Sequence, residues 1–93
     1  MTPDEPLDSP LPTAGFGIHV ASFTEVARAE SYISDLNRYG YPAFFVAKHI
    51  GDETWHRVYV GPYTRRGQAQ RASQVLQSRG LASYYFITKF GNG

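Results

Sequence analysis

The chain contains two copies of one sequence pattern, and this internal repeat restricts the folds open to it more than any other feature. Residues 20–46 align with residues 60–86 at a constant offset of 40 positions. The matched pairs include Val20 and Val60, Phe23 and Tyr63, Thr24 and Thr64, Ala29 and Ala69, Leu36 and Leu76, and Gly40 and Gly80. Because the two copies share apolar positions as well as turn residues, we expect both to form the same supersecondary unit.

Each copy predicts one helix between two strands. A threonine can cap each helix by accepting a hydrogen bond from an unpaired N–H, and Gly40 and Gly80 can end the helices in the left-handed conformation. Between these signals, apolar residues recur at helical spacing: Val26, Ala29, Ile33 and Leu36, and then Ala69, Ala72, Val75 and Leu76. Four runs of β-branched and aromatic residues predict strands at 16–23, 43–49, 55–61 and 83–89.

The resulting order, β-α-β-β-α-β, predicts an α+β protein of the ferredoxin-like or RNP-like class. In this fold a four-stranded antiparallel sheet, built here from two pseudo-repeats, carries two helices. Right-handed crossovers place both helices on one face of the sheet. The other face then has nothing in the chain to cover it.

Strand alternation assigns side chains to the two faces. We predict that the following residues point toward the helices: Ile18, Val20, Phe44, Val46, Val58, Val60, Tyr84 and Phe86. We predict that the uncovered face carries the others: His19, Ala21, Phe45, Trp55, Arg57, Tyr59, Tyr85 and Ile87. Three of these, Phe45, Tyr59 and Tyr85, would form a large exposed apolar patch, which usually marks a binding surface.

Composition fits one folded domain preceded by a linker. The chain has 93 residues, 42% of them hydrophobic and 15% aromatic, and no cysteine, which excludes disulfides and thiolate metal sites. Residues 1–14 are rich in proline and read as a flexible linker, residues 15–90 as the domain and residues 91–93 as a tail. From residue 11 onward nine basic and five acidic side chains give a mildly basic net charge of +4.

The sequence does not predict an enzyme, a cofactor or a metal site. Ser22 is not part of a Gly-x-Ser-x-Gly motif, and the three histidines, His19, His49 and His56, lack close metal-ligand spacing. Asp52 and Glu53 are adjacent, which suits a solvated turn better than a pair of glycosidase carboxylates. No apolar run approaches the roughly 20 residues that cross a bilayer, so any membrane attachment would come from an anchor upstream.

With its predicted elements in this order, the chain resembles the SPOR family, the sporulation-related repeat domain of bacterial cell-envelope proteins. The resemblance covers residues 16–88 and rests on "IHVASFTEVARAESYISDL" and "RVYVGPYTRRGQAQRASQVL". The family pattern has Gln-x-Gly-Ser-Phe after the first strand begins, an alanine-rich helix, and later Arg-Val-x-Val-Gly-Pro-Phe. Two positions depart from it, because His19 stands in place of glutamine and Ala21 in place of glycine.

The resemblance implies a non-catalytic module that binds peptidoglycan, prefers glycan strands stripped of stem peptides, and targets its parent protein to the division septum. It implies a periplasmic or cell-envelope location within a larger anchored or secreted protein, with septal or wall-remodelling proteins as further partners. The family's binding positions fall on His19, Ser22, Trp55, Arg57 and Tyr85. Together with the two remaining aromatics of the exposed patch, the predicted glycan-binding residues are His19, Ser22, Phe45, Trp55, Arg57, Tyr59 and Tyr85.

Two other functions fit the same fold. RNA-recognition modules share the strand order and stack bases on central-strand aromatics, but "RVYVGPYT" lacks their Arg/Lys-Gly-Phe-Gly-Phe core, so no nucleic acid is expected. Alternatively, the uncovered sheet could close against a protein partner or a second copy. RNA binding should weaken steeply with salt whereas binding of a neutral sugar should not. Self-association would depend on protein concentration without any ligand.

Overall fold

The structure is a computed structural model that describes residues 14–91. The elements follow the predicted order: β1 (Phe16–Phe23), α1 (Val26–Arg38), β2 (Ala43–Ile50), β3 (Glu53–Tyr63), α2 (Arg66–Ser78) and β4 (Phe86–Lys89). Residues 1–13 of the expected linker and residues 92–93 of the expected tail lie outside the described residues. The β-α-β-β-α-β prediction is therefore confirmed, with β4 shorter than expected.

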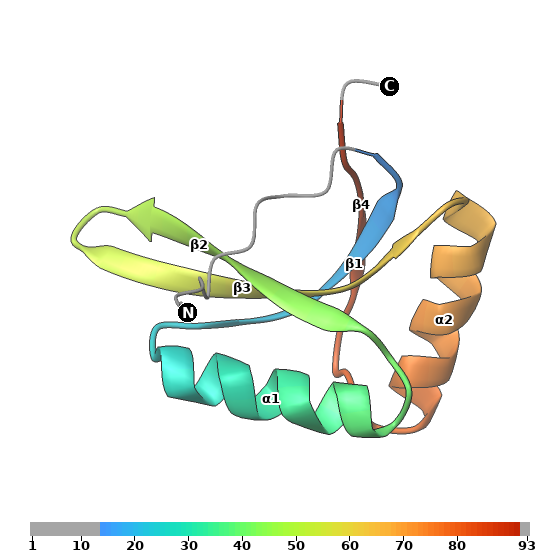
Figure 1. The fold of residues 1–93 in the computed structure, drawn as a ribbon, viewed down its shortest axis with the longest axis horizontal. Helices are drawn as coiled ribbons and strands as arrows, with labels where there is room; N and C mark the ends of the chain where they lie inside the picture. The colour runs from blue at the N-terminus through green and yellow to red at the C-terminus, as the bar shows by residue number, and fades with distance from the viewer. Residues whose placement is uncertain (1–13, 92–93) are drawn as a thin grey trace, which may run out of the picture.

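The four strands form one antiparallel sheet in the order β2-β3-β1-β4. Figure 1 shows α1 and α2 on the same side of this sheet, as right-handed crossovers require. Helix α1 packs on β1, β2 and β3, and α2 packs on β1, β3 and β4. Within residues 14–91 no helix covers the opposite side, so the predicted ferredoxin-like architecture with one uncovered face is confirmed.

The helices begin one residue later than the threonine pattern predicts. Their N-cap residues are Glu25 and Arg65, both in extended backbone conformation, so capping by Thr24 and Thr64 is wrong. The threonines remain in the bends that follow β1 and β3. At the start of α2 the Gln68 Oε1 instead accepts a hydrogen bond from the Arg65 N–H at 3.1 Å. The helix ends are as predicted, because Gly40 and Gly80 have φ of 92° and 75°.

The core lies between the helices and one face of the sheet. Its fully buried residues come from every layer: Ile18, Val58 and Val60 from the strands, Ala29 and Leu36 from α1, and Ala69 and Leu76 from α2. Val75 was expected among them but is 41% exposed. Ser73 is buried in its place, and its hydroxyl is satisfied because it donates to the Ala69 carbonyl at 2.7 Å.

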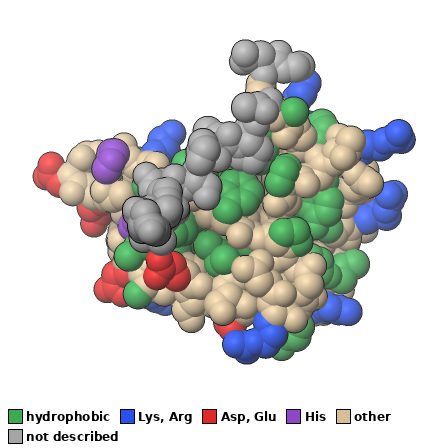
Figure 2. Space-filling view, viewed as in Figure 1, with side chains coloured by type: hydrophobic (Ala, Val, Ile, Leu, Met, Phe, Trp, Pro, Cys, Tyr) green, Lys and Arg blue, Asp and Glu red, His purple; other side chains and the backbone are tan. Residues whose placement is uncertain are grey.

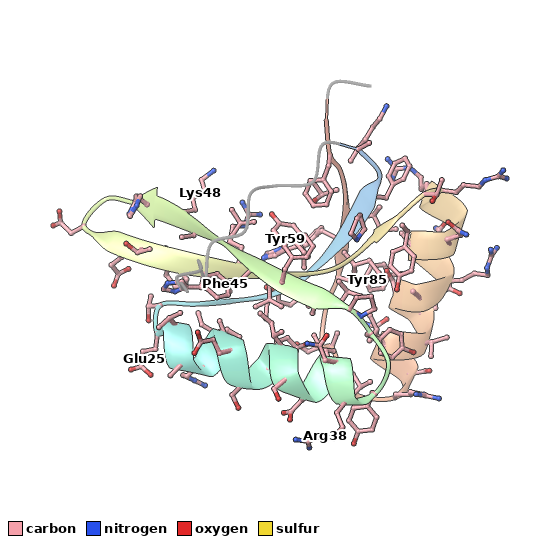
Figure 3. The ribbon with its side chains drawn as sticks, viewed as in Figure 1. Glu25, Arg38, Phe45, Lys48, Tyr59 and Tyr85 are labelled. Carbon is pink, nitrogen blue, oxygen red and sulfur yellow. The ribbon has the colours of Figure 1, made fainter. Side chains whose placement is uncertain are left out.

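The predicted facing of β2 and of the β4 segment is wrong, and the strand register shows why. In β2, Phe45 lies opposite Val58 and Phe44 opposite Tyr59, so Phe45 points into the core and Phe44 away from it. Phe45 is only 5% exposed, and Figure 3 shows it on the α1 side of the sheet with Tyr59 on the other side. Because Phe44 and Phe45 are both aromatic, alternation alone does not determine which of them points into the core. A shift of one residue exchanges the two faces of the strand.

The same inversion applies before and within β4. Tyr85 packs against the hydrophobic core, whereas its neighbours Tyr84 and Phe86 are 39% and 64% exposed. Ile87 lies opposite the buried Ile18, so it too belongs to the helix side rather than the uncovered face. Tyr85 and Phe45 therefore do not line the uncovered face as predicted. Tyr84, Phe86 and Phe44 take their places.

A register shift in β1 decides which residues share the uncovered face with β3. Between His19 and Ala21 the pairing with β3 is irregular, so Ala21 lies opposite the core residue Val58 and Ser22 opposite Arg57. Without such a bulge, residues three apart would point to opposite faces. The shift brings His19 and Ser22 together and turns Ala21 inward, contrary to the predicted facing of Ala21.

Phe45→Ala should lower the free energy of unfolding by about 3–5 kcal/mol, because it removes a buried aromatic ring from the core. Phe86→Ala is the matched control and should change it by no more than about 0.5 kcal/mol, since that ring is mostly solvated. Urea unfolding followed by circular dichroism measures both. Equal effects of the two substitutions would contradict the facing described above.

Candidate functional site

The open face, defined here as the side of the sheet away from α1 and α2, carries a mixed set of aromatic and polar side chains. Register and alternation assign the following residues to it: Gly17, His19 and Ser22 of β1, Phe44, Val46 and Lys48 of β2, Trp55, Arg57 and Tyr59 of β3, and Phe86 and Thr88 of β4. In the view of Figure 2, hydrophobic side chains gather in the middle, Lys and Arg mainly along the α2 side, and Asp and Glu on the β2–β3 hairpin and over α1.

The centre of the open face is closed by packed rings. The Tyr59 ring lies 5.7 Å from Phe44, 5.5 Å from Phe90 and 5.4 Å from His19, measured between ring centroids. Tyr59 is consequently only 5% exposed, and Phe90 only 6%. Tyr59 is on the predicted face, but its neighbours cover the ring that was expected to contact a ligand.

Phe90 reaches this position because Gly17 has no side chain. A Cβ on Gly17 would collide with the Phe90 ring, so glycine allows the ring to lie directly on β1. The Phe90 N–H also donates to the Gly15 carbonyl at 2.8 Å, which holds the chain in place after β4. A glycine inside a strand pattern is the sequence signal that could have indicated this close approach.

One side of the open face gathers His19, Ser22 and two aromatics that the sequence analysis had assigned to the helix side. The His19 Nε2 and Ser22 Oγ form a hydrogen bond of 3.0 Å. The imidazole lies 5.8 Å from the Tyr84 ring in an edge arrangement and 6.5 Å from Phe86 in a stacked one. Phe86 and Tyr84 offer exposed apolar rings beside this polar pair. A flat ring next to hydrogen-bonding groups is the arrangement that suits a sugar.

The surroundings of His19 favour its neutral form. Partial burial lowers the pKa of His19 below its usual 6.5, and the positive charge of Arg57 lowers it further, against a smaller opposite effect from the Ala21 backbone. A neutral imidazole presents one donor and one acceptor nitrogen. His19 can therefore act as a hydrogen-bonding group in the place where the family has glutamine.

The other side of the open face is formed by the β2–β3 hairpin. Trp55 lies opposite Lys48, and Arg57 lies opposite Val46. The Arg57 guanidinium is 5.9 Å from the centroid of the Tyr59 ring, a cation–π distance that links this part of the face to its centre. Trp55 and Arg57 are each half-buried. The structure thus places both on the open face, as predicted.

A groove opens where β4 leaves β1. Pairing between these strands involves only Phe16 to His19 of β1, so the remainder of β1 lies beside the segment that precedes β4. The groove has a volume of about 400 Å³ and is lined by Val20, Ala21, Ser22, Phe23, Tyr32, Gly80, Leu81, Ser83 and Tyr84. The Tyr32 hydroxyl donates to the Leu81 carbonyl at 2.5 Å and so ties α1 to one wall of the groove.

The described residues provide no arrangement that favours catalysis. The Ser22–His19 pair has the spacing of a nucleophile and its base, but Arg57 disfavours the imidazolium that a base must form. Within residues 14–91 there is no cluster of three His, Cys, Asp or Glu residues that could hold a metal ion. Over the same residues, no helix is both long and apolar enough to cross a membrane.

A two-layer α+β domain with an exposed, partly aromatic sheet face is typical of small binding modules. Comparison with known proteins identifies its family. A sequence model of the SPOR domain matches residues 12–86. The chain therefore belongs to the SPOR family. SPOR domains are binding modules rather than enzymes, and membership supports a peptidoglycan-binding module.

The fold also matches a solved structure. The crystal structure of the RlpA SPOR domain from Pseudomonas aeruginosa superposes with a TM-score of 0.70. The sequences are 20% identical, and the match covers 80% of this chain and 97% of that one. At this identity the match concerns the fold alone. None of the curated proteins compared with the chain matches it.

The lowered pKa of His19 should make the protein less stable in mild acid. Well above pH 6.5 the side chain is neutral in both states, but as the pH falls through 6.5 toward the lower folded-state pKa, the unfolded chain binds the proton first. The free energy of unfolding should therefore fall across this interval in wild type, and fall less in His19→Gln. Urea midpoints measured from pH 7.5 to 5 test this. Identical pH profiles for the two proteins would contradict it.

Proposed function

We propose that this chain binds bacterial peptidoglycan, prefers denuded glycan strands from which stem peptides have been removed, and targets its parent protein to the division septum. The observation that carries the proposal is the open face itself, with the exposed Phe86, the half-buried Trp55 and the His19–Ser22 pair displayed on one side of the sheet. Membership of the SPOR family indicates that the polymer is peptidoglycan. The positions of these side chains indicate how the protein would hold it.

The aromatic side chains would contact the apolar C–H faces of sugar rings. Phe86 and Tyr84 offer one such platform beside β1, and Trp55 offers another on the hairpin. Two platforms on different strands suit an extended polymer rather than a single small molecule. His19 and Ser22 lie beside the first platform and would hydrogen-bond hydroxyl or acetamido groups.

A preference for denuded strands would follow in part from the closed centre of the open face. Among the described residues, Phe44, Tyr59 and Phe90 pack their rings against one another there and form a closed floor. A stem peptide directed at this floor would keep the sugars away from the aromatic platforms. A bare glycan strand meets no such obstacle.

The structure disfavours RNA as the ligand. RNA-recognition modules stack bases on aromatics of the two central strands. Here Tyr59 in the middle of central strand β3 is covered, and Trp55 lies on the same strand but at its hairpin end. The exposed rings Tyr84 and Phe86 lie at the edge strand or just before it. Self-association through the open face remains an outcome of the experiment below.

Binding to purified sacculi tests the proposal. Wild type should be retained on amidase-treated sacculi, with weaker retention on untreated sacculi. Phe86→Ala and Trp55→Ala should each reduce binding by roughly threefold to tenfold, because each removes one aromatic platform. Tyr39→Ala is the matched control, since Tyr39 is 56% exposed but follows α1 on the helix layer.

Several outcomes would contradict the proposal. Absence of retention on both kinds of sacculi would exclude peptidoglycan binding. Equal retention on both kinds of sacculi would exclude the preference for denuded strands, although peptidoglycan would still be the ligand. Binding of single-stranded RNA with a steep loss at higher salt would support the RNA alternative. A molar mass that rises with protein concentration, without ligand, would support self-association.

A further inference from the structure

Two positively charged side chains flank Trp55 on the hairpin part of the open face. Lys48 lies directly opposite Trp55 on the neighbouring strand, and Arg57 lies two residues further along β3. Side chains opposite each other in an antiparallel pair are about 5 Å apart at Cβ, and residues two apart on a strand share a face. Figure 3 shows Lys48 on the same side of the sheet as Tyr59. Lys48, Trp55 and Arg57 therefore share one face of the hairpin.

Within residues 14–91, no carboxylate neutralises either cation. Among residues 14–91, no carboxylate lies within 4 Å of the Lys48 or Arg57 nitrogens, and the ion pair found there joins Arg38 to Asp35 at 3.7 Å. Glu53 shares this face but lies opposite Ile50 at the end of the hairpin, and it forms no ion pair with Lys48. Lys48 is exposed, while Arg57 is half-buried and held near the Tyr59 ring. An anion arriving at Trp55 would meet one solvent-exposed cation and one that is half-buried beside the Tyr59 ring.

Removal of a stem peptide creates such an anion. In a peptide-bearing strand the lactyl carbonyl of each muramic sugar is bonded to an amino-acid nitrogen and is uncharged. Amidase hydrolysis adds water across this C–N bond, releases the peptide as its amine and leaves the lactyl group as a carboxylate. A denuded strand thus differs from its precursor by one negative charge on every muramic sugar as well as by the missing peptide.

We infer that Lys48 and Arg57 bind the free lactyl carboxylate of a muramic sugar seated on Trp55. This inference rests on the proposed function and adds a specificity-determining residue, Lys48, to it. Discrimination then has an attractive part besides the steric one, because the cations gain a partner only after the amide has been cleaved. Charge-assisted hydrogen bonds from guanidinium and ammonium groups to a carboxylate provide the chemistry.

The inference changes the expected response to salt. Binding of a neutral sugar would hardly depend on salt, whereas two cation–carboxylate contacts should give a shallow dependence. The slope of log affinity against log salt should be no steeper than about two, since each contact contributes roughly one or less. RNA binding through many phosphates would be considerably steeper.

Denuded strands whose carboxylates have been converted to methylamides test the inference directly. The methylamide removes the charge while adding little bulk, so it separates charge from the steric effect of a stem peptide. Calorimetric titration of the intact chain should show that wild type binds the neutralised strands about fivefold to tenfold more weakly than the native denuded strands, which is the effect expected for exposed charge-assisted contacts.

Substitutions of Lys48 test whether this residue recognises the carboxylate. Lys48→Gln should bind native denuded strands about threefold more weakly than wild type and should bind neutralised strands as wild type does. Lys48→Arg should restore most of the affinity for native strands. Arg71→Gln is the matched control, because it removes one exposed positive charge from α2, on the opposite layer, and should change neither affinity.

The outcomes separate this inference from the proposed function. If wild type binds native and neutralised strands equally, the carboxylate is not recognised and the inference fails, although glycan binding stands. If Lys48→Gln weakens both polymers to the same extent, the lysine acts through structure and the inference also fails. If wild type binds neither polymer, the proposed function itself fails.

Discussion

The packing of two helices onto one face of the sheet is the interaction on which the rest of the molecule depends. Ile18, Val58 and Val60 on the central strands have no solvent exposure, and Leu36 and Leu76 meet them from α1 and α2. Because both crossovers are right-handed, this core occupies only one side of the sheet. Both helices are then used on this side, and neither is left to cover the other side of the sheet.

The open face is partly closed by the chain itself. Phe90 lies on Gly17 and covers Tyr59, so the middle of the face is a small second cluster of aromatic rings. This arrangement reduces the exposed apolar surface and leaves two separate aromatic regions, one around Phe86 and one around Trp55. This division keeps the exposed rings from forming one large contiguous apolar patch, which would promote association.

The two regions differ in chemistry. Around Phe86 the polar groups are the neutral His19 and the Ser22 hydroxyl, which suit uncharged sugar substituents. Around Trp55 the polar groups are the cations Lys48 and Arg57, which suit an anionic substituent. An alternating glycan with one neutral and one acidic sugar in each repeat would present both kinds of group. The open face is thus better described as two chemically unlike regions than as a uniform apolar platform.

The sequence by itself determined the order of elements, the layer architecture and the family, because these follow from periodicity, paired glycines and a repeat that do not depend on exact register. Alternation also placed His19, Trp55, Arg57 and Tyr59 correctly on the open face. Only the tertiary structure decided between neighbours in Phe44–Phe45 and Tyr84–Tyr85–Phe86, since adjacent aromatics satisfy alternation in either phase and a shift of one residue inverts the faces.

The burial of Tyr59 also needed the structure, because it depends on Phe90, which lies 31 positions later in the chain and reaches Tyr59 only through the space that Gly17 leaves open. The bulge in β1 is a further case. His19 and Ser22 are three residues apart, and only the irregular pairing with β3 turns both side chains to one face. Local pattern fixes which residues alternate, whereas pairing between distant strands fixes which side of the sheet each of them occupies.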